Sequence, residues 1–449
     1  MRLIAISSVL LCALRALAAQ PVNFTNDIAP ILVQKCLICH GPDKSKGSYR
    51  VDTYDWLLKP GSSKEPAITP GNSGKSKLFE LITTDDEEDR MPQKNEPLSP
   101  PEIARIKDWI TQGAHFAGAD SKAPLVSIIP PIRQPDAPAV YPSPIPITAL
   151  AFSIDGAELA VGGFHEITIW STADGKLRRR LKNVAQSTLA LAYDPSGKWL
   201  AAASGTPGKL GELKIFDPAS GQLARVLATS GDFMLSVAFS PDGAKLAAGS
   251  SDNSIRLFDF ATGKLERKIE QHSDWVTGLA FSHNGLLLAS ASRDKSARIY
   301  EVKTGEMTHS FLGHGDFVYA VAFAPDDVRA ISAGRDRKVH LWKMEEAKKD
   351  KPSEISGFEG EVFKLLATTN SIFTCASDGL VRQHSLDKTH ALVRTFGTPG
   401  EVIYSIALDA HATCIAAGSY DGKVRLWNIG DGKLVSEFIA APGLAAASN

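Results

Sequence analysis

The sequence predicts two folded domains: a small, mainly α domain followed by an all-β propeller with seven blades. Three observations support this prediction. A Cys-x-x-Cys-His motif lies between two helical patterns near the N-terminus, and a proline-rich stretch follows them. From residue 147 onward a unit repeats about every 42 residues, a period typical of propeller blades. A chain of 449 residues is also too long for one ordinary core.

The overall composition excludes some classes of partner. Hydrophobic residues make up 43% of the chain and charged residues 22%, which is ordinary for a globular protein. The formal net charge of -1 predicts no general attraction to nucleic acid or to an anionic membrane. Partners must therefore bind at local sites.

Residues 1–19 have the three-part layout of a secretory signal peptide. Arg2 precedes an apolar stretch at 3–14, and Ala16 and Ala18 mark the cleavage site. A dozen apolar residues are too few for the ~20 that span a bilayer, which favours cleavage over anchoring. We therefore expect an exported protein, in the periplasm or at the cell surface of a bacterium, without a membrane span after cleavage.

Two helices are expected in a first domain at residues 22–116. Asp27 is expected to cap the first helix, which contains Pro30 and ends at Cys36. The second has a capping box of Ser99 and Glu102, and its apolar stripe is core by default. That stripe consists of Ile103, Ile106 and Ile110. Residues 41–98 show no long periodic run, and a loop of that length needs something large to pack against, as a haem would be.

The motif Cys36-Leu37-Ile38-Cys39-His40 is the attachment signature of c-type haem. Cys36 and Cys39 would bond one haem covalently, and His40 would be the proximal iron ligand. A redox pair would be expected at the start of a helix after a strand. A zinc site would need a further ligand, for which only His115 lies nearby, and export disfavours free thiols. A vicinal disulfide is the remaining alternative.

The distal iron ligand must come from outside the motif, and cytochromes c commonly use Met. Four Met residues follow the signal, and Met234, Met307 and Met344 lie in the repeats. Met91 stands on a polar loop before the second helix and is the expected distal ligand. His115 is the alternative. No catalytic residue is expected.

Several motifs of the first domain resemble the planctomycete-type cytochrome c family over residues 24–116. They comprise Ile31-Leu32, the Cys36 to His40 motif with Gly41-Pro42, Tyr49-Arg50-Val51-Asp52-Thr53, Pro66-Ala67-Ile68, Pro70-Gly71, Ser76-Lys77-Leu78, Met91-Pro92, Leu98-Ser99, Glu102-Ile103 and Trp109-Ile110. Departures from the family pattern occur at Gly47-Ser48, Tyr49 and Gln93. The resemblance implies haem binding and electron transfer, with fusion to a propeller as a familiar arrangement.

Residues 117–146 are expected to be a proline-rich linker, residues 147–441 the propeller, and residues 442–449 a tail. Seven third strands are predicted to end in Trp170, Phe216, Phe258, Tyr300, Trp342, His384 and Trp427. This region resembles the WD-repeat family. His314, Ser332, Asp336 and Trp342 occupy that family's structural hydrogen-bond relay, for which a catalytic role is not expected.

The sequence contains two runs of like charge. Asp85-Asp86-Glu87-Glu88-Asp89 is either a solvated turn or a docking patch for a basic redox partner near the haem edge. Arg178-Arg179-Arg180 is expected to be solvated edge protection. The predicted function is therefore an exported electron carrier whose propeller docks a protein partner. The alternative is the haem-bearing subunit of a periplasmic oxidoreductase, whose propeller would hold a substrate or second cofactor.

Overall fold

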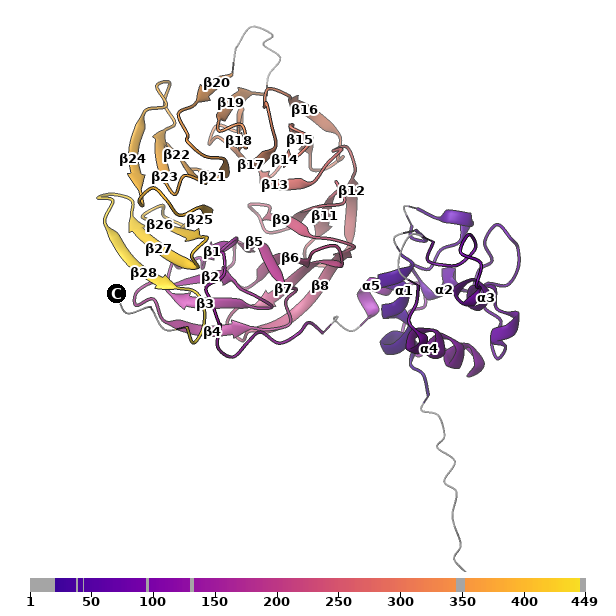
Figure 1. The fold of residues 1–449 in the computed structure, drawn as a ribbon. Coiled ribbons are helices and arrows are strands. Elements are labelled where there is room, and N and C mark those ends of the chain that lie inside the picture. Colours follow the sequence, from indigo (N-terminus) through magenta and orange to yellow (C-terminus); the bar gives the residue numbers. More distant parts are fainter. Residues whose placement is uncertain are drawn as a thin grey trace, which may run out of the picture. The chain divides into compact units, whose positions relative to one another are not determined.

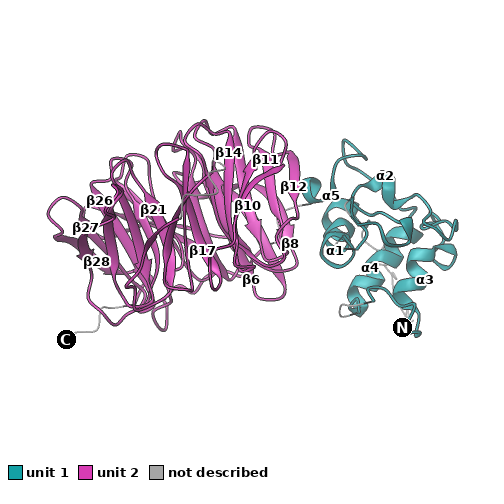
Figure 2. Cartoon of the chain, turned by 90° about the horizontal axis from the view of Figure 1, so that it is seen from above, with its two compact units in different colours: residues 1–130 teal, residues 131–449 magenta. Residues whose placement is uncertain are grey.

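The computed structural model describes residues 21–37, 39–42, 44–93, 97–129, 133–344 and 352–444. The expected signal peptide lies outside these residues, as does most of the expected tail. The chain divides into two compact units, residues 1–130 and 131–449 (Figure 2). Among the described helices, none combines the length and apolar character that crossing a membrane requires.

Unit 1 is small and mainly helical, as predicted. Its elements are η1 (Phe24–Ile28), α1 (Ala29–Lys35), η2 (Lys46–Ser48), α2 (Tyr54–Leu57), η3 (Ser73–Lys75), α3 (Lys77–Thr83), α4 (Pro100–Thr111) and α5 (Leu125–Ile128). One apolar core joins them, in which the ring of Phe24 contacts Tyr54, Trp109 and Phe116 at centroid distances of 5.1–5.6 Å.

The expected N-terminal cap is confirmed for the second of the two predicted helices and is wrong for the first. The capping box of Ser99 and Glu102 at the start of α4 is present, and Ile106 and Ile110 are buried. At the first helix the cap is Asn23, whose side chain accepts a hydrogen bond from the Asn26 amide. The prediction of Asp27 as that cap was wrong, because Asp27 already lies within the first turn and accepts from the Asn23 amide.

Unit 2 is the predicted seven-bladed propeller, with seven four-stranded antiparallel sheets in a ring (Figure 1). Blades 1 to 4 comprise β1 (Leu150–Phe152), β2 (Glu158–Gly162), β3 (Ile167–Ser171) and β4 (Leu177–Leu181); β5 (Ser187–Tyr193), β6 (Leu200–Thr206), β7 (Leu210–Asp217) and β8 (Gln222–Ser230); β9 (Met234–Phe239), β10 (Lys245–Ser250), β11 (Ile255–Asp259) and β12 (Leu265–Ile269); and β13 (Val276–Phe281), β14 (Leu287–Ser292), β15 (Ala297–Glu301) and β16 (Met307–Phe311). Blades 5 to 7 comprise β17 (Val318–Phe323), β18 (Arg329–Gly334), β19 (Val339–Lys343) and β20 (Ser353–Ile355); β21 (Val362–Ala367), β22 (Ser371–Ala376), β23 (Val381–Ser385) and β24 (Leu392–Phe396); and β25 (Ile403–Leu408), β26 (Cys414–Ser419), β27 (Lys423–Asn428) and β28 (Leu434–Ile439).

The structure contains the slot residues and the hydrogen-bond relay that the blade repeat predicted. All seven slot residues lie on third strands, from Trp170 on β3 to Trp427 on β27. In blade 5, His314 Nδ1 lies 2.8 Å from Asp336 and His314 Nε2 2.8 Å from Ser332, to which Trp342 donates at 3.2 Å. This relay ties the loop before β17 to the blade and has a structural role.

The ring closes through residues 138–148, which we call the clasp. Each blade takes all four strands from one continuous stretch, so no strand is exchanged between the first and last blades. The Tyr141 amide donates to the Pro442 carbonyl at 3.0 Å, and the Ile147 amide donates to the Ser419 carbonyl at 3.1 Å. The buried Tyr141 hydroxyl donates to Glu166 of blade 1 at 2.7 Å. The clasp therefore joins blade 7 to blade 1.

Parts of the expected linker are packed. In unit 1, Leu125 is fully buried, and its amide donates to the Asp52 carbonyl at 2.8 Å. In unit 2, Gln134 and Tyr141 are buried. The described prolines next to these three residues, Pro124, Pro135 and Pro142, are exposed.

Candidate metal centre

The Cys-x-x-Cys-His motif forms a hydrogen-bonded turn at the end of α1. The Cys36 amide closes the helix by donating to the Leu32 carbonyl at 3.0 Å. The Cys36 carbonyl then accepts from the amides of Cys39, at 3.1 Å, and His40, at 3.0 Å. These bonds fix the backbone of both cysteines and the histidine in one turn. Neither thiol is in a disulfide, which argues against the vicinal-disulfide alternative.

The side chain of His40 is oriented by the next segment. Its Nδ1 lies 3.2 Å from the Tyr49 carbonyl oxygen, and the two rings meet edge to face at 5.6 Å. Because a carbonyl oxygen can only accept, Nδ1 carries the proton in this bond and Nε2 keeps its lone pair. The Tyr49 hydroxyl donates to the Leu57 carbonyl of α2 at 2.9 Å. A histidine ligand held in this way is typical of metal sites.

Cys36 faces an apolar environment. Burial, with smaller contributions from Cys39 and Glu102, raises the pKa of the Cys36 thiol to about 12. Burial also raises the pKa of Tyr49. A thiol of such high pKa is a poor nucleophile at neutral pH, which argues against a thioredoxin-like redox pair.

Met91 lies between α3 and α4. Its amide donates to the Leu81 carbonyl at 2.8 Å, so the loop returns to the end of α3, and its side chain packs half-buried against the core of unit 1. The acidic run before it is exposed at all five residues. His115 is exposed beyond the C-terminal end of α4, and its carbonyl accepts from the Trp109 indole at 3.0 Å.

These residues fit a c-type haem. The donor set offers two free thiols, an imidazole nitrogen and a thioether, which are the groups that attach and ligate such a haem. Half-buried apolar side chains also border the core and could contact a porphyrin. They are Leu37, Tyr49, Leu58, Leu78, Phe79, Met91 and Ile103.

Tyr49 was the functional residue that sequence reasoning missed. In the sequence it stands within one motif that matches the family and is also a departure from the family pattern, and neither observation indicates a role. In the structure its carbonyl lies against His40 Nδ1, and its hydroxyl donates to the Leu57 carbonyl. The signal that could have found it is an amphipathic Tyr a few residues after the motif, where a buried hydroxyl needs a partner.

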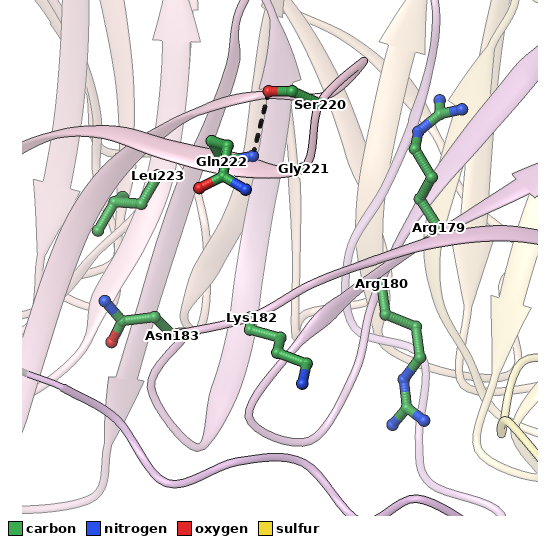
Figure 3. Close-up of a pocket in the computed structure, with 8 residues that line it drawn as sticks. All are labelled: Arg179, Arg180, Lys182, Asn183, Ser220, Gly221, Gln222 and Leu223. Atoms are coloured by element: carbon green, nitrogen blue, oxygen red, sulfur yellow. Dashed lines mark hydrogen bonds between the residues drawn. The ribbon is translucent and has the colours of Figure 1, made fainter.

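The arginine run of blade 1 lies on the outer strand β4, and Arg178 is exposed there as expected, but the other two arginines are partly buried and paired. Arg179 pairs with Glu158, and Arg180 pairs with the fully buried Glu166 at 2.5 Å. Both arginines, with Lys182, border a shallow hollow of ≈ 590 Å³ between β4 and β8 (Figure 3). Because carboxylates already neutralise two of these cations, we assign no anion site there.

Comparison with known proteins agrees with this geometry. Residues 36–95 match the family described as planctomycete cytochrome C, a domain that implies a haem cofactor. Residues 221–259, 263–301, 305–343 and 391–428 match the WD domain, G-beta repeat, which implies protein–protein interaction. No curated protein sequence matches the chain. On these matches and on the seven-bladed fold, the chain joins a planctomycete cytochrome c domain to a propeller of WD repeats.

Proposed function

We propose that this protein is an exported c-type cytochrome that transfers electrons. In this proposal one haem is bonded covalently to Cys36 and Cys39, with His40 as the proximal ligand and Met91 as the distal ligand. The observation that carries it is the turn in which the Cys36 carbonyl accepts from the amides of Cys39 and His40, together with the Tyr49 carbonyl that holds Nδ1 of His40.

The residues of unit 1 have separate roles in this proposal. The two thiols hold the group, and Tyr49 keeps His40 in the tautomer that leaves Nε2 free for iron. The half-buried apolar side chains exclude water from the haem faces. A bound haem supplies a one-electron couple whose potential depends on its axial ligands. With His40 and Met91 at both axial positions, an electron carrier is favoured over an enzyme that binds its substrate at iron.

The position of α4 supports Met91 over His115 as the distal ligand. Cys36 is influenced by the carboxylate of Glu102 in the first turn of α4. His115 lies beyond the opposite end of this helix, whose 12 residues span about 18 Å. Met91 precedes this helix and packs against the same core as Cys36, so we favour it as the distal ligand.

Covalent attachment can be tested on the full chain, matured in a host that assembles c-type haem. The denatured protein should exceed the mass of its mature polypeptide by one haem, and its visible spectrum should change reversibly on reduction. Cys36→Ala with Cys39→Ala should abolish the added mass. Cys414→Ala, at a free cysteine of the propeller, should keep it. A colourless wild-type protein would overturn the proposal.

The exposed acidic run is proposed as the docking patch for a basic redox partner. In Asp85→Asn with Asp89→Asn, electron exchange with a small basic cytochrome should slow several-fold at low ionic strength, because opposite charges speed encounter. The difference should vanish at high salt. Asp108→Asn with Asp120→Asn removes the same charge elsewhere on unit 1 and should have a smaller effect. Equal rates for both double variants would exclude the patch.

A further inference from the structure

Blade 5 departs from its neighbours at one position of the third strand. In blades 3, 4, 6 and 7 this position is Arg, and each Arg pairs with the Asp four residues before it. The pairs are Arg256–Asp252 at 2.5 Å, Arg298–Asp294 at 3.3 Å, Arg382–Asp378 at 2.8 Å and Arg425–Asp421 at 3.3 Å. Blade 5 has His340 in this position, four residues after Asp336.

With histidine in the place of arginine, one buried polar atom of blade 5 has no hydrogen-bond partner among the described residues. His340 is 6% exposed, and among the described residues its Nε2 has no hydrogen-bond partner. Asp336 Oδ2 lies 3.8 Å from this nitrogen, which is too far for a hydrogen bond. A buried imidazole nitrogen without a partner costs free energy, so this site calls for a further group.

Two other ligand atoms converge on the same point. His314 lies on the other side of Asp336, with its Nδ1 2.8 Å from Oδ2, and the two imidazole rings meet edge to face at 4.6 Å. One ligand atom from each of His314, Asp336 and His340 lies within 4.8 Å of the others. Zinc binds imidazole nitrogen and carboxylate oxygen at about 2.0–2.2 Å, so two donors 3.8 Å apart can share one ion.

We propose that blade 5 binds a divalent transition-metal ion, best represented by zinc, through His314, Asp336 and His340. His314 would move its proton from Nδ1 to Nε2, where Ser332 Oγ at 2.8 Å can accept it. The remaining positions on the ion would be filled by water molecules. The ion would take the place of the arginine used in the other blades and tie the loop before β17 to β19.

Blade 4 provides the matched comparison within the same chain. His272 Nδ1 lies 2.8 Å from Asp294, and its Nε2 lies 2.6 Å from Ser290, which repeats the relay of blade 5. Its third strand carries Arg298 instead of a second histidine, and this cation already pairs with Asp294. The proposal therefore assigns the ion to blade 5 and none to blade 4.

The test measures zinc in the haem-loaded full chain after dialysis against micromolar free zinc. Wild-type protein should hold one zinc ion in addition to its haem iron. His340→Arg, which recreates the residue of four other blades, should fold and bind zinc at least tenfold more weakly. His411→Ala, at an exposed turn of blade 7, should bind it as wild type does. Equal zinc in wild type and His340→Arg would overturn the proposal.

X-ray absorption at the zinc edge keeps the test independent of how the variant folds. The wild-type spectrum should show only nitrogen and oxygen neighbours with the scattering pattern of two imidazoles. Sulfur neighbours would place the zinc on cysteines and overturn the assignment to blade 5.

Discussion

His40 Nδ1 lies 3.2 Å from the carbonyl oxygen of Tyr49, and this contact couples the proposed proximal ligand to the backbone of the next segment. The Tyr49 hydroxyl donates in turn to the Leu57 carbonyl at 2.9 Å. The contact with His40 would set the tautomer of the ligand, and the contact with Leu57 would stabilise the segment that carries the Tyr49 carbonyl.

Removal of the Tyr49 hydroxyl should lower the stability of the fold without changing the axial ligation of the haem. In Tyr49→Phe the buried Leu57 carbonyl loses its partner, so the free energy of unfolding should fall by about 1–3 kcal/mol in urea titrations. The backbone bond to His40 remains, and the low-spin haem spectrum should be kept. Tyr54→Phe removes a comparable bond to the Ala114 carbonyl and serves as the control. Altered axial ligation in Tyr49→Phe would show that the hydroxyl is needed to position His40.

The clasp should stabilise the whole propeller, because it joins the first and last blades. In Tyr141→Ala we expect the free energy of unfolding of unit 2 to fall by about 3–5 kcal/mol, the usual cost of deleting a buried aromatic ring. Val140 is 61% exposed, so Val140→Ala should change little. Denaturant unfolding followed by tryptophan fluorescence measures both. Similar losses in the two variants would show that the ring does not depend on Tyr141.

The contacts of the clasp also predict at which residues a protease can separate the two units without destabilising the propeller. A protease site inserted at residues 130–132 should release a folded propeller, because the clasp then stays with blades 1 and 7. Deletion of residues 138–146 should leave a propeller that unfolds at lower denaturant concentration. A propeller equally stable after the deletion would contradict the role of the clasp.

Blade 6 should make stability depend on pH through His384. Burial, together with the nearby Arg382 and His390, lowers the pKa of His384 from 6.5 to about 4. Between these values the unfolded chain binds a proton that the folded protein does not, so stability should fall as pH decreases from 6.5 to 4. A shift of this size corresponds to about 3 kcal/mol.

His384→Phe should remove this pH dependence and raise stability at pH 5. Phe fits because Trp, Phe or Tyr occupies the same slot in the other six blades, and Nδ1 of His384 is buried without a partner among the described residues. Urea titrations from pH 4 to 7 measure the effect, with His411→Ala as a control at an exposed histidine. An unchanged slope in His384→Phe would assign the pH dependence to other groups.

Local patterns predicted the features that depend on residues close in sequence. The motif at Cys36 and the capping box at Ser99 are short, and the blade repeat recurs seven times. The helix α3 was missed because its seven residues are too few for a clear apolar period. The clasp could not be predicted, because it joins segments that only closure of the ring brings together. The pairing of Arg180 with Glu166 was missed for a different reason, since it depends on the register between β3 and β4, which a single strand pattern does not give.

Met91 decides whether this protein is a carrier or a catalyst at iron. A thioether ligand fills the distal position and stabilises reduced iron, so wild-type protein should be low-spin in both oxidation states and should not bind carbon monoxide. Met91→Ala should open that position. The variant should keep its covalent haem, bind carbon monoxide, lose the thioether-to-iron absorption of the oxidised form and show a lower reduction potential.

The propeller supplies a control at an exposed methionine. Met307 on β16 is 44% exposed, so Met307→Ala should change neither the haem spectrum nor the fold. Met234 is a poorer control, because it is fully buried in a propeller core and its truncation would cost about 2–5 kcal/mol. If wild-type protein binds carbon monoxide readily, or if Met91→Ala has an unchanged spectrum, Met91 is not the ligand. His115 or an open site would then take its place, and a haem enzyme would become the better interpretation.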